Sequence, residues 1–111
     1  MAPFRVFGHL ISTQDQIKAL ENIRRHLDRQ GVLIFALFGP NMTLAFQRMP
    51  PTADFEGEWE AGKKLKRITS VEPDPNRQVN HVTMRYVWEE EGKTMDKSWE
   101  FPMRYFFRYE L

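Results

Sequence analysis

Residues 64–101 read KLKRITSVEPDPNRQVNHVTMRYVWEEEGKTMDKSWEF, and this stretch decides the fold. Apolar and polar side chains alternate along it with a period of two, which is the pattern of strands that bury one face of a sheet. Turn-forming residues interrupt the alternation at residues 73–76 and 90–93. The pattern therefore predicts three antiparallel strands, at residues 64–72, 78–89 and 94–101.

The alternation also predicts which side chains share a face of this sheet. On the second strand one face carries Val82, Met84, Tyr86 and Trp88, and the other carries His81, Thr83 and Arg85. On the third strand the apolar positions in line are Met95, Trp99 and Phe101. Pro102 cannot donate a hydrogen bond to a neighbouring strand, so it predicts an edge position or the end of the strand.

An amphipathic helix is predicted at residues 14–29. Its apolar positions recur at helical spacing: Ile17, Leu20, Ile23 and Leu27. Thr13 and Gln16 have the spacing of a capping box, in which two side chains bond to free N–H groups of the first turn. Gly31 is expected to end the helix, because glycine adopts the left-handed conformation of a C-terminal cap at little cost.

Residues 32–38, VLIFALF, predict a strand that is buried on both faces, because every position is apolar. Residues 43–49 fit either a helical turn or a short strand, which Pro50 and Pro51 would end. The fold class is predicted to be α+β, with one helix and one buried strand packed with an antiparallel meander of three or four strands. We expect a single domain over residues 1–111, with the helix and buried strand in 1–41 and the sheet in 42–111.

Composition narrows the expected partners and location. The chain has 16 basic and 15 acidic residues and a net charge of +1, which gives no reason to expect nucleic acid or an acidic membrane surface as a partner. It has no cysteine, which excludes disulfides, thiolate zinc sites and cysteine nucleophiles. The longest apolar run is too short to span a bilayer, and no signal peptide is evident, so we expect a cytoplasmic protein.

Residues 20–41, LENIRRHLDRQGVLIFALFGPN, resemble the helix and fifth strand of a class I S-adenosylmethionine-dependent methyltransferase. Residues 3–10 and 13–20 look like the segment after that family's fourth strand. Residues 70–111 resemble the antiparallel insert that folds over the active site of small-molecule methyltransferases. That insert closes on a motif that appears here as Met103, Arg104 and three aromatic residues, then Glu110 and Leu111.

The resemblance also implies what the chain lacks. The family's Gly-rich loop and its ribose-binding acidic residue belong to strands that have no counterpart here, so we expect no cofactor to bind to this chain alone. The resemblance therefore predicts a non-catalytic, methyltransferase-derived module for binding and self-association. One alternative is a component of a small-molecule methyltransferase, which would bind S-adenosylmethionine only when a partner chain supplies the cofactor domain. Another alternative is a small-molecule-binding protein with an aromatic pocket.

Four residues are candidates for a substrate pocket: His9, Trp99, Arg104 and Tyr105. The resemblance places His9 in the substrate cleft. Arg104 has the geometry to bind a carboxylate or phosphate through two hydrogen bonds, or to pair within the chain with Glu100 or Glu110. Trp99 and Tyr105 belong to an aromatic-rich second half, which fits a core, a ligand pocket or a subunit interface. No metal site is predicted, since no two histidines have the spacing of metal ligands. No catalytic residue is predicted either.

Self-association as a homodimer is also expected. A strand at residues 32–38 without its neighbours would expose apolar side chains and unpaired backbone groups. A two-fold interface would cover both, and the aromatic residues 105–109 are the expected covering surface.

Overall fold

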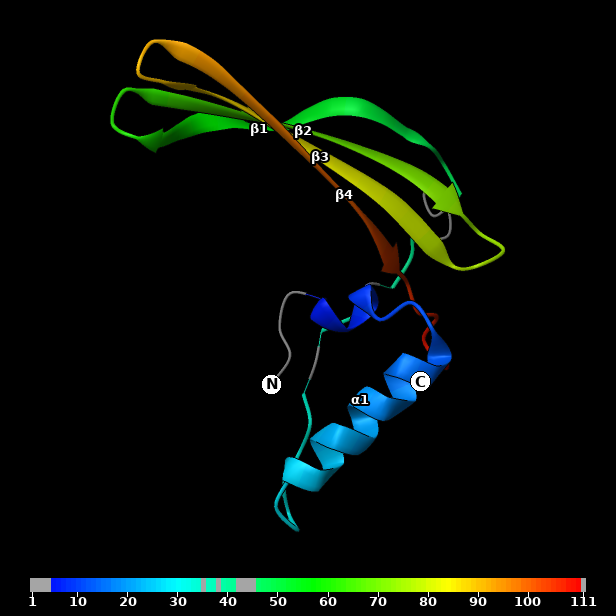
Figure 1. Ribbon diagram of the computed structural model, residues 1–111. Helices are drawn as coiled ribbons and strands as arrows, with labels where there is room; N and C mark the ends of the chain where they lie inside the picture. Colours follow the sequence, from blue (N-terminus) through cyan, green and yellow to red (C-terminus); the bar gives the residue numbers. More distant parts are fainter. Residues whose placement is uncertain (1–4, 35, 38, 42–45, 111) are drawn as a thin grey trace.

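The computed structural model describes residues 5–34, 36, 37, 39–41 and 46–110 (Figure 1). In chain order its elements are η1 (Val6–His9), α1 (Thr13–His26), β1 (Met49–Glu60), β2 (Lys63–Asp74), β3 (Val79–Glu90) and β4 (Lys93–Arg104). One α-helix thus accompanies a four-stranded sheet, and the predicted α+β class is confirmed.

The sheet is an antiparallel meander in which each strand pairs with the next one along the chain, in the order β1-β2-β3-β4. The three strands predicted from the alternation are confirmed; β2 and β4 are longer than predicted, and β3 has the predicted length shifted by one residue. The β3–β4 turn has positive φ at both central residues, 49° at Glu91 and 73° at Gly92. That is the geometry of a tight hairpin turn whose twist matches the strands it joins.

Strand β1 was not predicted, because Pro50 and Pro51 indicated a break at that point. The structure tolerates both prolines because β1 lies at an edge of the sheet, and its pairing with β2 contains register shifts. Pro102 lies in β4, at the opposite edge, as predicted.

Helix α1 differs from its prediction at both ends. Its N-cap is Ser12, whose Oγ accepts a hydrogen bond of 3.1 Å from the Asp15 N–H. The helix ends at His26, and Gly31 instead closes a turn by donating its N–H to the carbonyl oxygen of Asp28 at 2.9 Å. The amphipathic helix is therefore present, but the predicted capping box at Thr13 and the Gly31 cap are wrong.

The predicted buried strand at residues 32–38 is also wrong for the part that the structure describes. Residues 32–34, 36 and 37 form no strand, and Val32 and Ile34 are 76% and 64% exposed. Phe35 and Phe38 lie outside the described residues. A strand needs a neighbour for its backbone N–H and C=O groups. In this meander each described strand is paired with the next strand along the chain, and the segment instead runs from α1 back toward β1 (Figure 1).

The core lies where η1 meets the end of β4. The buried apolar side chains among the described residues are Phe7, Val79, Val82, Tyr105 and Phe106. The rings of Phe7 and Phe106 lie 5.8 Å apart between centroids, which joins the N-terminal segment to the residues that follow β4. Because Tyr105 and Phe106 are 0% and 3% exposed, these two do not form the intermolecular covering surface expected at residues 105–109.

Candidate binding surface

One face of the sheet carries nearly all of its large apolar side chains, as the alternation predicted. The register aligns Leu65 with Trp88 and Met95, and Val71 with Val82 and Phe101. We call this surface the aromatic face and define it by Trp59, Leu65, Val71, Val82, Met84, Tyr86, Trp88, Met95, Trp99 and Phe101. The opposite face is polar and includes an ion pair between Arg85 and Asp96. The aromatic face is therefore the side of the sheet that is suited to burial.

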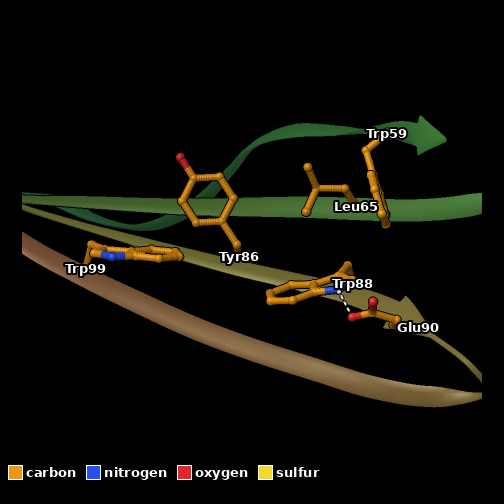
Figure 2. Close-up of a pocket in the computed structure, with 6 residues that line it drawn as sticks. All are labelled: Trp59, Leu65, Tyr86, Trp88, Glu90 and Trp99. Atoms are coloured by element: carbon orange, nitrogen blue, oxygen red, sulfur yellow. Dashed lines mark hydrogen bonds between the residues drawn. The ribbon is translucent and has the colours of Figure 1, made fainter.

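Near the β1–β2 and β3–β4 turns, the aromatic face forms a hollow of about 570 Å³ (Figure 2). Its lining residues come from all four strands: Trp59, Leu65, Tyr86, Trp88, Glu90 and Trp99. The Tyr86 and Trp99 rings meet edge to face, with centroids 5.4 Å apart. The Trp88 indole N–H donates to Glu90 Oε2 at 3.3 Å. Glu90 is the one charged residue of the lining. Trp59 and Trp99 remain 48% and 52% exposed.

A side-chain cation already lies beside the hollow. Lys63 Nζ lies 4.9 Å from the centroid of the Trp59 ring, within the range in which a cation is attracted to the negative face of an aromatic ring. The Glu90 carboxylate adds a formal negative charge to the same lining. Apart from Glu90, the side chains that line the hollow are aromatic or apolar.

The other half of the aromatic face lies beside η1. The His9 ring contacts the Phe101 ring, with centroids 5.4 Å apart, although His9 itself is exposed. Nearby, Asp54 accepts two hydrogen bonds from Arg67, at 2.9 and 3.0 Å, and a third from the Thr69 hydroxyl. The hydrogen bond from Arg67 lowers the pKa of Asp54, and the pair neutralises the Arg67 charge at this end of the face.

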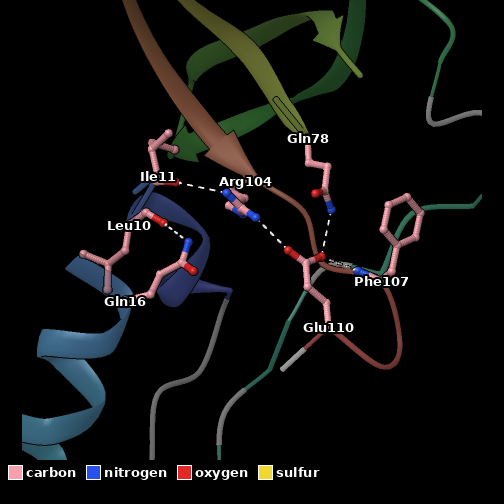
Figure 3. A network of polar contacts seen from close by, with 7 residues as sticks. All are labelled: Leu10, Ile11, Gln16, Gln78, Arg104, Phe107 and Glu110. Atoms are coloured by element: carbon pink, nitrogen blue, oxygen red, sulfur yellow. Dashed lines mark hydrogen bonds and ion pairs between the residues drawn. The ribbon is translucent and has the colours of Figure 1, made fainter. Parts of the chain in front are cut away.

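Arg104 lies outside the aromatic face, in a polar network at the end of β4 (Figure 3). Its Nη2 donates to Glu110 Oε1 at 2.6 Å, and its Nη1 donates to the carbonyl oxygen of Ile11 at 3.3 Å. Gln78 and the Phe107 N–H donate to the other Glu110 oxygen, at 2.7 and 3.1 Å. Burial raises the pKa of Glu110, but these hydrogen bonds outweigh it, so that the pKa lies below its ordinary value. Of the two intramolecular partners considered for Arg104, the structure has Glu110.

Tyr105 is fully buried, and its hydroxyl has no hydrogen-bond partner among the described residues. Burial, followed by the charges of Asp74 and Glu110, raises the pKa of Tyr105. The four predicted pocket residues are therefore not brought together. Trp99 lines the aromatic hollow and His9 touches the far half of the same face, whereas Arg104 and Tyr105 belong to the junction between the sheet and the N-terminal segment.

Of the six residues that line the hollow, the sequence singled out only Trp99 as a site residue, and not Trp59, Leu65, Tyr86, Trp88 or Glu90. Trp59 was missed as part of the hollow because β1 was not predicted, so its place beside Leu65 was not apparent. Within the part of the chain that the structure describes, no cluster of His, Cys, Asp or Glu side chains could hold a metal ion. Among those same residues, no helix combines the length and apolar character needed to cross a membrane.

With this geometry established, the chain was compared with known proteins. No protein-family model, curated protein or solved structure matches it. The surface itself is therefore the basis for a functional assignment.

Proposed function

We propose that the chain is a self-associating binding module that forms a two-fold dimer by covering its aromatic face. The observation that supports this most strongly is the exposure of large aromatic side chains on one face of a regular sheet. Trp59 and Trp99 are about half exposed, and Phe55 on β1 is 46% exposed. Large exposed apolar patches on folded proteins mark interaction sites.

The size of the exposed surface supports a protein partner. The chain has 8796 Å² of accessible surface. A compact monomer of this mass is expected to have roughly 6,500 Å², so the excess is roughly 2,300 Å². The radius of gyration is 17.7 Å, against about 13 Å for a compact domain of this length. Homodimer interfaces bury about 2,000–5,000 Å² over both protomers, so each protomer has enough surplus surface to form one.

The edges of the sheet favour association through its face. Pro50 and Pro51 lie on one edge strand and Pro102 lies on the other, and prolines on edge strands discourage the pairing of a further strand. Tryptophan, tyrosine and methionine are enriched in the buried centres of protein interfaces, and the aromatic face contains all three. A second copy is thus expected to cover the face of the sheet and not to extend it.

Sedimentation equilibrium over a range of micromolar concentrations tests this proposal. We expect a mass near twice 13.3 kDa, with dissociation on dilution. A mass of one chain over the whole range would refute self-association as the function.

The aromatic hollow also supports a second candidate, the binding of a small organic cation. Its volume of about 570 Å³ lies within the range of ligand pockets, roughly 300–1,000 Å³. The aromatic rings and the Glu90 carboxylate of the lining favour a positively charged ligand, which would compete with Lys63 for the Trp59 ring. Titration with a quaternary ammonium salt, followed by tryptophan emission, should saturate if this is the function. A neutral isostere with the same effect would count against it.

Descent from a methyltransferase, and completion by a partner chain that carries the cofactor domain, stay predictions of the sequence. The resemblance of residues 70–111 to an antiparallel insert supports them, since that region does form β3, β4 and the end of β2. Calorimetric titration with S-adenosylmethionine is the test. Saturable heat from the chain would favour the enzyme component over the non-catalytic module.

A further inference from the structure

A second apolar surface is uncovered in the same chain. It belongs to residues 13–34, which we call the helical arm and which comprise α1 and the segment that follows it. Ile17 on α1 and Leu27 at its C-cap are 51% and 36% exposed, and Val32 and Ile34 are more exposed still. An amphipathic helix gains most of its stability by packing its apolar side against another element.

The base of the helical arm is fastened in place. Gln16 is 4% exposed and donates from its side chain to the Leu10 carbonyl oxygen at 2.7 Å. Arg104 donates to the Ile11 carbonyl oxygen, and Gly8 packs so closely on the Arg104 carbonyl that an added Cβ would lie 2.8 Å from its oxygen. These contacts hold α1 at the end of the sheet opposite the β1–β2 and β3–β4 hairpin tips, pointing away from the strands (Figure 1). The arm cannot lie over its own aromatic hollow without breaking them.

The helical arm and the aromatic hollow match in length and in charge. The 14 residues of α1 give a helix about 21 Å long at 1.5 Å per residue. The part of β3 beside the hollow, residues 84–90, spans about 23 Å at roughly 3.3 Å per residue. The last turn of α1 is basic, with Arg24, Arg25 and His26. The β3–β4 hairpin tip carries Glu89, Glu90 and Glu91 before Lys93, and of these Glu90 lies on the aromatic face.

We infer that the helical arm of each protomer packs on the aromatic face of its partner, so that two reciprocal contacts close the dimer. The inference rests on the proposed self-association and specifies which surface meets the aromatic face. It removes both apolar exposures with one two-fold operation, because each protomer supplies one arm and one face. The alternative dimer, in which two aromatic faces pack on each other, would leave Ile17 and Leu27 uncovered.

The absence of cysteine from the chain makes cross-linking a direct test. Arg24→Cys places a thiol on the side of α1 that carries Ile17 and Leu20, whereas Arg25→Cys places one on the opposite side. Lys97→Cys lies on the aromatic face, opposite Tyr86, whereas Ser98→Cys lies on the polar face, opposite Arg85. All four positions are exposed. Single-cysteine variants, one of each pair labelled with ¹⁵N, are refolded together and treated with a short bis-maleimide.

We expect the Arg24→Cys and Lys97→Cys variants to form a mixed cross-linked product of two chains. The product should be at least tenfold more abundant than with either control, Arg25→Cys or Ser98→Cys. A dimer in which only Lys97→Cys chains cross-link to each other would overturn the arm contact and leave the proposed dimer intact. The double variant with Arg24→Cys and Lys97→Cys distinguishes the partner's face from the chain's own. If it cross-links only within one chain, the helical arm folds back on its own aromatic face, which would overturn the inference. A monomer by sedimentation would refute the proposed function and this inference together.

Discussion

Replacement of Trp99 by alanine should dissociate the dimer. Trp99 is 52% exposed on the aromatic face. Large aromatic side chains bury about 150–250 Å² when covered, so the exposed part of Trp99 offers roughly 100 Å². At about 25 cal/mol per Å², its burial contributes ~2.5 kcal/mol per protomer. A two-fold dimer contains the residue twice, so the loss is about 5 kcal/mol, equivalent to roughly a 4,000-fold increase in Kd.

Sedimentation equilibrium of the Trp99→Ala chain over a wide concentration range measures this change in Kd. The matched control is Tyr109→Ala, which removes an aromatic side chain that is 89% exposed outside the aromatic face. The control should leave the Kd unchanged. Urea denaturation of both variants at monomer concentrations separates lost association from lost folding, because Trp99 also contacts the Tyr86 ring. Equal effects of the two substitutions on the Kd would refute the assignment of the interface to the aromatic face.

Three further predictions concern the junction and the ion pairs. Gly8→Ala should lower the free energy of unfolding by about 1–3 kcal/mol, because the new Cβ would meet the Arg104 carbonyl oxygen at 2.8 Å; an unchanged urea midpoint would contradict this packing. Glu110→Gln should cost about 1.5–3 kcal/mol, since it removes the charge that Arg104 binds at 2.6 Å; urea denaturation at pH 7 is the check. The pKa values of Asp54 and Glu110 lie below their ordinary 3.8 and 4.5 in the folded chain. The two carboxylates should therefore stabilise the fold fully at neutral pH. That stabilisation should fall as the pH drops through their ordinary pKa values toward the lower pKa values of the folded chain. Urea midpoints measured from pH 7 to pH 3 should fall less steeply in the Asp54→Asn, Glu110→Gln double variant, and an equally steep fall would contradict the assignment.

The parts of the fold that sequence predicted correctly depend on local patterns. The period of two at residues 64–101 and the turn at Gly92 specify strands and hairpins through neighbouring residues alone, and the structure has them. Residues 32–38 show the limit of such patterns. An apolar run is compatible with a strand, but its backbone forms one only where another strand is free to pair, and that depends on the arrangement of the whole sheet.

Local patterns predicted the part of the binding surface that lies within single strands, but not the contacts between distant parts of the chain. Alternation placed Tyr86 and Trp88 on one face of the second strand, and Trp99 in line with Met95 and Phe101 on the third. The register between β3 and β4 shows that all three aromatic residues share one face. The burial of Tyr105 and the pairing of Arg104 with Ile11 join opposite ends of the chain. No periodicity within a short window carries information about contacts of that separation.

The three tryptophans of the chain allow the central claim to be tested without any substitution. Trp59, Trp88 and Trp99 all line the aromatic hollow, and the chain contains no others. Acrylamide quenching of tryptophan emission should therefore weaken, and the emission maximum should move to shorter wavelength, as the concentration rises through the dimerisation range. An association that doubles the mass while quenching and emission stay constant would show that the dimer forms through another surface, and would contradict the account.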